Sequence, residues 1–321
     1  MTLGVVILNW NGMDVTPRCL DSILRSSSPP DQIVVVDNAS TDGSADHIRG
    51  RYPQVALIVN DSNLGFAEGN NVGMRYLLER AFDLVLLLNN DTVVDPDCLR
   101  ELKRAAETQP AAAYGATIYE LSAPGRIWYS GGSISRLTLE ARHETAPADA
   151  PGTPRPTDFI TGCCLMFRSD ALRRIGLLDR DFFAYYEDVD WCLRAKAADE
   201  RFLYVPAAVL RHDVSHSFRR AGTRDRGAAR YSWTQSRPLV LYLAYRNRLL
   251  LARKHASGKL HLVFLILRRL ARAALHVAML LPSGRGSQAK AVVVGTMAGL
   301  RWPPQPAKID RYIRATLAKS I

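Results

Sequence analysis

One carboxylate with two amides directly before it follows a strongly apolar run in residues 84–96, LVLLLNNDTVVDP. The carboxylate is Asp91, the amides are Asn89 and Asn90, and the run reads as a buried strand. A carboxylate at the end of such a strand can hold a hard divalent cation beside a diphosphate, because these ions prefer carboxylate and phosphate oxygens. An Asn-Asp turn that caps the next helix explains the same residues. The spacing therefore predicts a cation ligand or a turn.

Two further segments combine an apolar strand with polar turn residues. In VVVDNASTDGS, residues 34–44, Asp37 and Asn38 could bond a pyrimidine base or a ribose hydroxyl, or could simply form a turn. In NLGFAEGNNVG, Gly65 and Asn71 belong to a glycine- and asparagine-rich helix start that suits phosphate or sugar hydroxyls. Neither G-x-G-x-x-G nor a P-loop pattern is present, which excludes the usual dinucleotide and P-loop sites.

Acidic and aromatic residues alternate in DRDFFAYYEDVDWCLRA, before a helix expected at residues 191–198. A sugar hydroxyl is a poor nucleophile until a positioned carboxylate takes its proton. Asp188, with Glu187 beside it, could be that base, and the neighbouring aromatic rings could stack on a sugar. Acidic residues that complement a helix N-terminus are the alternative. His212, after the strand-like FLYVPAAVL, is either a surface residue or a nitrogen ligand of the same cation.

Alternating strand and helix signals in the first 110 residues predict how these side chains are positioned. Near-continuous apolar strands imply a parallel sheet covered on both faces, an α/β fold whose ligands bind beyond the carboxyl ends of the strands. The polar residues fall at those ends. The expected strands are 5–8, 32–36, 55–59 and 84–88, the expected helices are 17–24, 44–51, 69–79 and 96–107, and the polar residues at the strand ends are Asn9, Asn11, Asp37, Asn38, Asn63, Gly65, Asn89, Asn90 and Asp91.

The remaining sequence divides into two parts. Residues 111–160 read as short strands and turns, with a Pro- and Ala-rich loop at 146–156 that we expect to be mobile. From residue 239 onward the pattern is helical and basic. We therefore expect a catalytic domain over residues 1–218, with a nucleotide-binding half up to about 110 and an acceptor half after it. A basic helical region would follow at 219–321.

Charge is distributed unevenly between these parts. Residues 1–210 carry 20 Lys and Arg against 28 Asp and Glu, whereas residues 211–321 carry 22 against 3. Such a basic region could face nucleic acid, anionic lipid or a phosphorylated substrate. Its basic residues alternate with aliphatic rather than aromatic side chains, which argues against nucleic acid.

One expected helix, residues 260–281, is apolar except for a narrow stripe of basic residues. Such a helix suits a membrane interface, and the alternative is a core helix with the arginines turned to solvent. The apolar runs are too short to span a membrane. The stripe consists of His261, Arg268, Arg269, Arg272 and His276.

Cysteine usage and the N-terminus indicate the compartment. The five cysteines are odd in number and form no C-x-x-C pair, which favours a reducing, cytoplasmic setting. MTLGVVILNW reads as a core strand rather than a signal peptide. We therefore expect a peripheral protein on the cytoplasmic face of the cell membrane.

Taken in order, eight motifs resemble the family-2 glycosyltransferases, in particular the bacterial rhamnosyltransferase-like branch. The resemblance covers roughly residues 3–250, and its strength lies in the order of the motifs rather than in any one of them. The motifs are ILNWNG at 7–12, VVDNASTDGS at 35–44, NLGFAEGNNVG at 63–73, LLLNNDT at 86–92, TGCCLMFR at 161–168, FFAYYEDVDWCLRA at 182–195, His212, and YRNR at 245–248.

The resemblance implies a GT-A fold, an inverting mechanism and a divalent cation, Mg or Mn. It places Asp37 at the base, Asn89 near the ribose, Asp91 and His212 on the metal, and Asp188 as the catalytic base. One departure weakens the metal site: the family's Asp-x-Asp is Asn89-Asn90-Asp91 here, which leaves one carboxylate. The Gln-x-x-Arg-Trp signature of processive synthases is absent, so single-sugar addition is expected.

The expected reaction moves a sugar, with rhamnose favoured, from a deoxythymidine- or uridine-diphosphate donor to a saccharide or lipid-linked saccharide of a bacterial surface polysaccharide. Two rival functions make different demands. A sugar nucleotidyltransferase needs a Gly-rich, basic triphosphate loop near the N-terminus, and ILNWNGMD has none. A non-catalytic membrane scaffold would be expected to have lost Asp91, Asp188 or His212, and all three are present.

Overall fold

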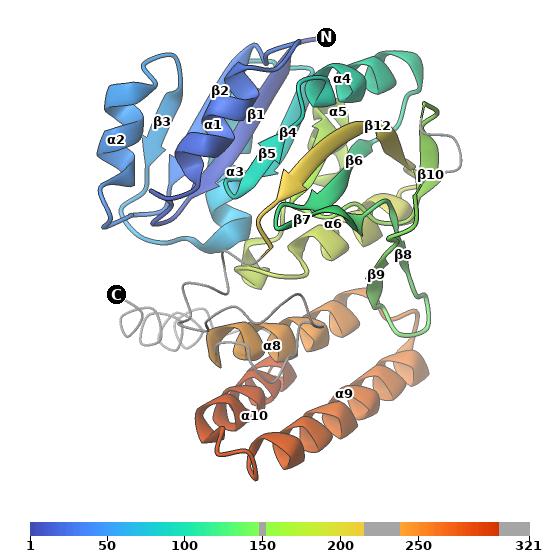
Figure 1. Cartoon of the computed structure of the whole chain (residues 1–321). Helices are drawn as coiled ribbons and strands as arrows, with labels where there is room; N and C mark the ends of the chain where they lie inside the picture. Colours follow the sequence, from blue (N-terminus) through green and yellow to red (C-terminus); the bar gives the residue numbers. More distant parts are fainter. Residues whose placement is uncertain (148–151, 215–237, 302–321) are drawn as a thin grey trace. The chain divides into compact units, whose positions relative to one another are not determined.

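The computed structural model describes residues 1–147, 152–214 and 238–301 (Figure 1). The chain forms two compact units. Two short segments, 136–139 and 181–186, belong with the C-terminal helices rather than with the sheet. The domain boundary predicted near residue 218 and four residues of the predicted mobile loop lie outside the described residues. Unit 1 comprises residues 1–135, 140–180 and 187–216, and unit 2 comprises 136–139, 181–186 and 217–321.

A mixed sheet forms the centre of unit 1. Its first four strands are parallel, as the apolar runs predicted, and they adjoin a second half in which β11 runs antiparallel to β4 and β6. The sheet order is β10-β12-β6-β11-β4-β1-β2-β3, with β5 on β12 and β7 on β6. Its strands are β1 (Leu3–Asn9), β2 (Gln32–Asp37), β3 (Ala56–Val59), β4 (Leu84–Asn89), β5 (Thr92–Val94), β6 (Ala113–Glu120), β7 (Ala123–Tyr129), β10 (Arg155–Thr157), β11 (Cys164–Arg168) and β12 (Phe202–His212).

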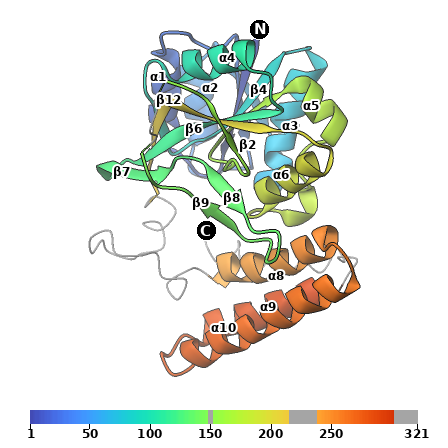
Figure 2. The same cartoon turned by 90° about the vertical axis from the view of Figure 1, so that its right-hand side faces the viewer.

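Helices cover both faces of this sheet. Figure 2 shows α1 and α4 on one face and α3, α5 and α6 on the other. The two remaining strands, β8 (Gly132–Ile134) and β9 (Ala141–His143), form a separate two-stranded sheet. The α/β fold predicted from the sequence is confirmed. The helices of this unit are α1 (Thr16–Leu24), α2 (Ser44–Arg51), α3 (Gly65–Glu79), α4 (Cys98–Thr108), α5 (Ser169–Ile175) and α6 (Glu187–Ala197), and a short 3-10 helix, η1, spans Arg180–Phe182.

Two glycines allow α3 to lie very close to the sheet. A Cβ atom on Gly69 would approach Leu8 Cδ1 to 2.5 Å, and one on Gly73 would approach Val6 Cγ1 to 2.4 Å. Real Cβ atoms do not make such contacts, so any larger residue would push the helix away from β1. These two glycines of the NLGFAEGNNVG motif therefore serve helix packing. The helix itself begins at Gly65, four residues before the predicted start.

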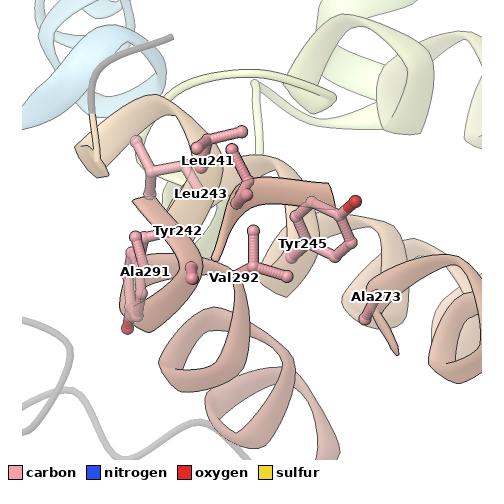
Figure 3. Close-up of a cluster of buried hydrophobic side chains, with 9 residues drawn as sticks. Leu241, Tyr242, Leu243, Tyr245, Ala273, Ala291 and Val292 are labelled. Atoms are coloured by element: carbon pink, nitrogen blue, oxygen red, sulfur yellow. The ribbon is translucent and has the colours of Figure 1, made fainter. Parts of the chain in front are cut away.

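Unit 2 is built on three helices, α8 (Pro238–His255), α9 (Lys259–Leu280) and α10 (Gly286–Leu300). Their shared core is a cluster of buried apolar side chains (Figure 3), against which Phe183 and Ala184 also pack. The cluster consists of Leu241, Tyr242, Leu243, Tyr245, Ala273, Leu280, Ala289, Ala291 and Val292.

The basic stripe of α9 does not face solvent, contrary to one of the two orientations considered from the sequence. Arg269 is buried and donates to the Thr138 carbonyl at 2.7 Å, and buried His276 is hydrogen-bonded to the Tyr245 hydroxyl at 2.8 Å. The exposed positions of this helix are instead largely apolar. They include Leu260, Val263, Phe264, Leu267, Leu275 and Met279. In the described ranges, no helix is long and apolar enough to cross a membrane.

Candidate active site at the edge of the sheet

Backbone pairing brings the ends of the first four strands to one edge. Asn9 pairs with Asp37, Leu8 with Asn89, and Asp37 with Val59. The polar residues that end β1, β2 and β4 are therefore neighbours because of strand register alone. This edge is where parallel sheets bind ligands.

Asn9 holds the carboxylate of Asp37 in place. Its Nδ2 donates to Asp37 Oδ1 at 2.6 Å and to Ser44 Oγ at 2.9 Å, and its Oδ1 accepts from Thr16 Oγ1 at 2.6 Å. The backbone N–H of Ser40 donates to the other Asp37 oxygen at 2.9 Å. Asn9 is 0% exposed and Asp37 1%. Asn9, predicted to contact the donor, thus has its side-chain groups engaged within the protein and orients Asp37.

Three other predicted donor-binding asparagines also make internal hydrogen bonds. Asn38 Nδ2 donates to the Gly65 carbonyl at 3.0 Å, which fixes the start of α3. Asn71 donates to the Leu178 carbonyl at 2.8 Å and accepts from the N–H of that residue at 3.1 Å. Asn11, at φ +51°, accepts the backbone N–H of Thr41 at 2.7 Å. These residues shape the loops around the edge.

The amides before Asp91 are more open to solvent. Asn89 and Asn90 are half-buried. Asn89 N–H donates to the Cys163 carbonyl at 3.0 Å, and Asn90 Nδ2 donates to Thr16 Oγ1 at 2.9 Å. Their partial exposure at the carboxyl end of β4 leaves them accessible to a ligand.

Asp91 and His212 meet because β12 pairs with β5. His212 lies opposite Thr92 in that ladder, and the N–H of Asp213 donates to the Asp91 carbonyl at 2.8 Å. His212 Nε2 and Asp91 Oδ1 are 3.1 Å apart, and both side chains are nearly buried. Despite this short distance, no donor among the described residues meets Asp91 Oδ1 with the geometry of a hydrogen bond. A buried carboxylate oxygen without such a partner is suited to bind a cation.

Trp128 and His143 pack beside His212 and were not singled out from the sequence. The Trp128 ring meets His212 edge-on at a centroid distance of 4.9 Å and His143 at 4.5 Å. Burial lowers the pKa of His143 to about 4, so this ring is neutral. The three residues come from β7, β9 and β12, and no local spacing connects them. Packing of Trp128 and His143 beside His212 restricts the rotation of the His212 ring.

Asp91 and His212 lie close enough together to supply two ligands to one divalent cation. Neighbouring ligands of an octahedral ion bound at 2.0–2.1 Å lie about 3 Å apart, and the observed separation is 3.1 Å. Within residues 1–147, 152–214 and 238–301, no group of three or more His, Cys, Asp or Glu could hold a metal ion. The remaining ligands would have to be diphosphate oxygens and water, as is common for magnesium-type sites.

The loop at Gly162 and Cys163 connects the acidic stretch to this edge. Asp188 Oδ2 accepts the N–H of Gly162 at 2.9 Å, and the carbonyl of Cys163 accepts the N–H of Asn89 at 3.0 Å. Asp188 Oδ1 also accepts the N–H of Val189 at 2.8 Å. Burial raises the pKa of Asp188, and the two N–H donors oppose that shift. A carboxylate with a raised pKa is a stronger base.

Glu187 is the more deeply buried of the two acids. It is 5% exposed, and its Oε2 has no hydrogen-bond partner in the described part of the chain. Burial raises its pKa well above the ordinary value, and the charges of Asp188 and Asp190 raise it further. The larger shift therefore falls on Glu187, which leaves Asp188 as the acid that ionises more readily.

Asp190 belongs to a structural ion pair. It is fully buried and accepts from Arg194 Nε at 2.8 Å. Arg194 also donates to the carbonyls of Ile175 and Leu177, each at 2.7 Å. The helix α6 begins at Glu187 rather than at the predicted Trp191, so all three acids lie in its first turn, where the helix dipole favours negative charge.

The mixed α/β sheet of unit 1 has the GT-A fold. A family model described as "Glycosyltransferase like family 2" matches residues 2–230, and the chain belongs to that family. It is a glycosyltransferase. The resemblance to the rhamnosyltransferase-like branch is confirmed by the three relatives described next.

Among curated proteins, the chain is 29% identical over 238 residues to the N-acetylglucosaminyl-diphospho-decaprenol L-rhamnosyltransferase of Mycobacterium tuberculosis, covering 67% of this chain and 77% of that protein. It is 26% identical to Rhamnosyltransferase WbbL of Escherichia coli, covering 48% of this chain and 63% of that protein. It is 21% identical to the dTDP-rhamnosyl transferase RfbF of Shigella flexneri, covering 84% and 86%.

Solved structures support the fold. The mannosyltransferase PcManGT from Pyrobaculum calidifontis, in complex with GDP-Man and Mn²⁺, matches with a TM-score of 0.53 at 17% identity, covering 94% of this chain and 87% of that one. GalNAc-T7 with UDP, GalNAc and Mn²⁺ matches with a TM-score of 0.56 at 15% identity, covering 66% of this chain and 44% of that one.

Proposed function

We propose that this enzyme transfers one sugar from a nucleotide-diphosphate donor to a hydroxyl of a lipid-linked saccharide, with inversion at the anomeric carbon. The observation that carries the proposal is a shared loop. Gly162 binds the Asp188 carboxylate, and the adjoining Cys163 binds the strand end that bears Asn89. A carboxylate of raised pKa is thereby tied to the edge where the donor is expected.

The sheet edge would bind the donor. Asp37 would be placed at the base, Asn38, Gly65 and Asn71 would shape the loops around the donor, and Asn89 would lie near the ribose. Asp91 and His212 would hold a Mg or Mn ion, which neutralises the charge of the diphosphate. A single carboxylate in the motif, together with the imidazole of His212, makes this cation site weaker than an Asp-x-Asp site and more dependent on the diphosphate oxygens.

The acidic turn would activate the acceptor. Asp188 takes the proton from the acceptor hydroxyl, and the oxygen attacks the anomeric carbon as its bond to the diphosphate breaks. Attack from the face opposite the leaving group inverts the configuration. The proton remains on Asp188, and the bond electrons leave with the nucleoside diphosphate. Burial raises the pKa of Glu187, which disfavours a second negative charge beside Asp188.

The relatives narrow the substrates that we propose. Three of them are named rhamnosyltransferases, one for a dTDP donor and one for an acceptor on diphospho-decaprenol. We therefore favour dTDP-rhamnose as donor and a diphospho-lipid-linked saccharide of a bacterial surface polysaccharide as acceptor. The expected product carries one added sugar.

A thermal-shift screen of nucleotide-sugars with and without Mn²⁺ tests the donor and cation together. Binding at 100 times Kd stabilises a protein by about 2.7 kcal/mol. We expect dTDP-rhamnose to raise the melting temperature by several degrees with Mn²⁺ and much less with EDTA. Equal shifts in EDTA would remove the cation from the proposal, and the absence of any shift from dTDP- or UDP-sugars would remove the donor class.

We further propose that the outward face of α9 binds an anionic membrane surface on the cytoplasmic side. Leu260 is 88% exposed, Leu267 61% and Leu275 62%, so this face offers apolar side chains to its surroundings. Residues 238–301 contain eleven Lys and Arg and no Asp or Glu. An apolar face within a purely basic region matches anionic lipid. A second copy would bring like charges together, which disfavours self-association.

Vesicle flotation tests this surface in the full-length protein. In vesicles with 30% phosphatidylglycerol, the pair Leu267→Glu and Leu275→Glu should lower bound protein by about tenfold or more, because each loses apolar burial worth roughly 1.5–3 kcal/mol. Thr108→Glu, at an exposed position of α4, adds the same kind of charge outside α9 and should not change binding. A lower oligomeric mass in the double variant with unchanged flotation would assign the face to a second copy instead.

A further inference from the structure

The segment 181–186, which belongs to unit 2, has an unusual backbone. Phe183, Tyr185 and Tyr186 have φ values of +63°, +70° and +74°. Residues other than glycine rarely adopt this left-handed region, and bulky aromatic residues do so only when the surroundings enforce it. The N–H of Ala184 donates to the Phe182 carbonyl at 2.7 Å, which closes a three-residue turn of the rare, strained γ form. Some other part of the protein must hold this conformation.

Asn247 of α8 makes the contacts that hold it. The two N–H groups of its Nδ2 lie within hydrogen-bond distance of three carbonyls, those of Phe182 at 2.9 Å, Ala184 at 2.8 Å and Tyr185 at 2.7 Å, so one N–H is shared between two of them. The side chain is 0% exposed, so water does not compete for these carbonyls. One amide nitrogen thus gathers three carbonyls that a regular element would have satisfied along its own backbone.

Neighbouring residues of the YRNR motif reinforce this contact. Arg246 Nε donates to Asn247 Oδ1 at 2.8 Å, which sets the orientation of the amide, and Arg246 also donates to the Asp181 carbonyl. The Arg248 guanidinium lies over the Tyr186 ring, 5.5 Å from its centroid. The segment is therefore held at both ends as well as at its centre.

The held segment leads directly into the proposed catalytic acids. Tyr186 is followed in the chain by Glu187 and Asp188, the first residues of α6. A change of the backbone angles at Tyr185 or Tyr186 would redirect the two residues that follow. The proposed function uses 182–195 and leaves the YRNR motif without a role, and the contacts above give it one.

We propose that Asn247 is a positioning residue for catalysis, whose amide holds the left-handed segment 181–186 in the conformation that delivers Asp188. It acts through the backbone and touches neither substrate nor donor. The inference rests on the proposed function for its effect on transfer, but the hold on the segment itself is independent of it. Removal of the amide should let the segment relax, misplace Asp188 and leave the sheet edge unchanged.

Three measurements on the full-length Asn247→Ala variant test this role. Transfer at saturating donor should fall by about tenfold to a hundredfold, the scale of a misplaced catalytic group, while the Kd of dTDP with Mn²⁺ stays within about twofold. Hydrogen exchange at residues 181–189 should become faster. Arg253→Ala is the matched control, because it removes a bond from α8 to the Leu300 carbonyl and leaves the segment untouched.

A rescue experiment separates positioning from general loss of structure. In the Asn247→Ala background, Tyr185→Gly should recover more transfer than Tyr185→Ala. Both remove the ring, and only glycine adopts the left-handed backbone freely. Equal rates for these two double variants would overturn the role assigned to the left-handed backbone.

The outcomes distinguish the two proposals. Unchanged hydrogen exchange in Asn247→Ala would overturn the hold on the segment. Faster exchange with unchanged transfer would leave the hold standing but would overturn the positioning role, whereas the assignment of Asp188 as base is overturned only by near wild-type transfer in Asp188→Asn. A loss of donor affinity equal to the loss of transfer would show a general structural defect and would also overturn it.

Discussion

The sheet edge and the acidic turn of α6 position their polar groups by different means. At the edge, Asp37 and Asn89 are placed by strand register, and Asp91 meets His212 through the pairing of β5 with β12. No unusual backbone angle is needed on these strands. Asp188, in contrast, follows a segment with three left-handed aromatic residues. The proposed donor side of the site is thus a product of the fold, whereas the proposed acceptor side depends on side chains that hold a loop.

The two regions also treat buried charge differently. The negative charge of Asp37 is stabilised by hydrogen bonds from the Asn9 amide, the Ser40 hydroxyl and the Ser40 backbone N–H. Glu187 has no comparable partner among the described residues for its Oε2, and Asp188 and Asp190 lie beside it in the same turn. Compensation suits a group that must stay fixed during binding, while a raised pKa suits a group that must take up a proton.

The largest effect should come from breaking the sheet edge. Asp91→Ala removes the one carboxylate among the two proposed cation ligands, Asp91 and His212. The transition state should lose several kcal/mol of charge stabilisation, so transfer should fall by about 10³-fold or more. The affinity for dTDP should lose its dependence on Mn²⁺. Calorimetry and initial rates measure both.

Asp95→Asn provides the control for that substitution. Asp95 lies just beyond β5 and forms an ion pair with Arg211 rather than with Asp91 or His212. It should keep its Mn²⁺-dependent affinity. Unchanged nucleotide affinity in Asp91→Ala would contradict the placement of the cation.

A smaller effect, on stability, is expected at Asp190. Asp190→Asn breaks an ion pair in which Asp190 is fully buried, whereas its partner Arg194 is partly exposed and keeps two carbonyl contacts. Unfolding free energy should fall by about 2–3 kcal/mol, somewhat below the usual loss for a completely buried pair. Chemical denaturation measures this. Transfer per folded molecule should remain near wild type, and a specific loss of transfer would instead make Asp190 the base.

The smallest effect should be a gain of stability at Glu187. Its pKa is raised in the folded protein from an ordinary value near 4.5. Above pH 4.5 the unfolded chain loses this proton more readily than the folded protein does, so folding is accompanied by proton uptake. Wild-type stability therefore falls with rising pH across the window between the ordinary and the raised pKa. Glu187→Gln carries no such cost and should be more stable at pH 7 by about 1–2 kcal/mol.

Melting temperatures between pH 4 and pH 8 test that prediction. The difference between Glu187→Gln and wild type should be small at pH 4, where Glu187 is protonated in both states, and should grow toward pH 8. A difference that does not change with pH would show that burial of the Glu187 charge is not its cause.

Much of the first half of the fold could be predicted because its signals are local. The helix at Ser44–Arg51 has the predicted bounds, and β2 and β4 each extend one residue beyond the prediction. The start of α3 was placed four residues late, because glycines weaken a helix signal locally while packing on β1 favours them. Tertiary contact outweighed local propensity there.

Contacts between distant segments set the limits of the sequence analysis. The placement of His212 beside Asp91 came from the resemblance, and Trp128 and His143 were missed because only long-range strand pairing brings them together. The pattern of α9 predicted an apolar helix with a basic stripe, but it did not predict which side of the helix faces inward. The contacts of Arg269 with Thr138 and of His276 with Tyr245 turn that stripe inward.

The central claim is that donor binding at the sheet edge and proton removal at the acidic turn are separate tasks. The most direct test is the Asp188→Asn variant, with the initial transfer rate at saturating donor measured beside the affinity for dTDP and Mn²⁺. The amide keeps the shape of the side chain but cannot take a proton. The account predicts transfer slower by about 10²-fold or more with affinity within about twofold of wild type. Near wild-type turnover, or an equal loss of affinity, would contradict it.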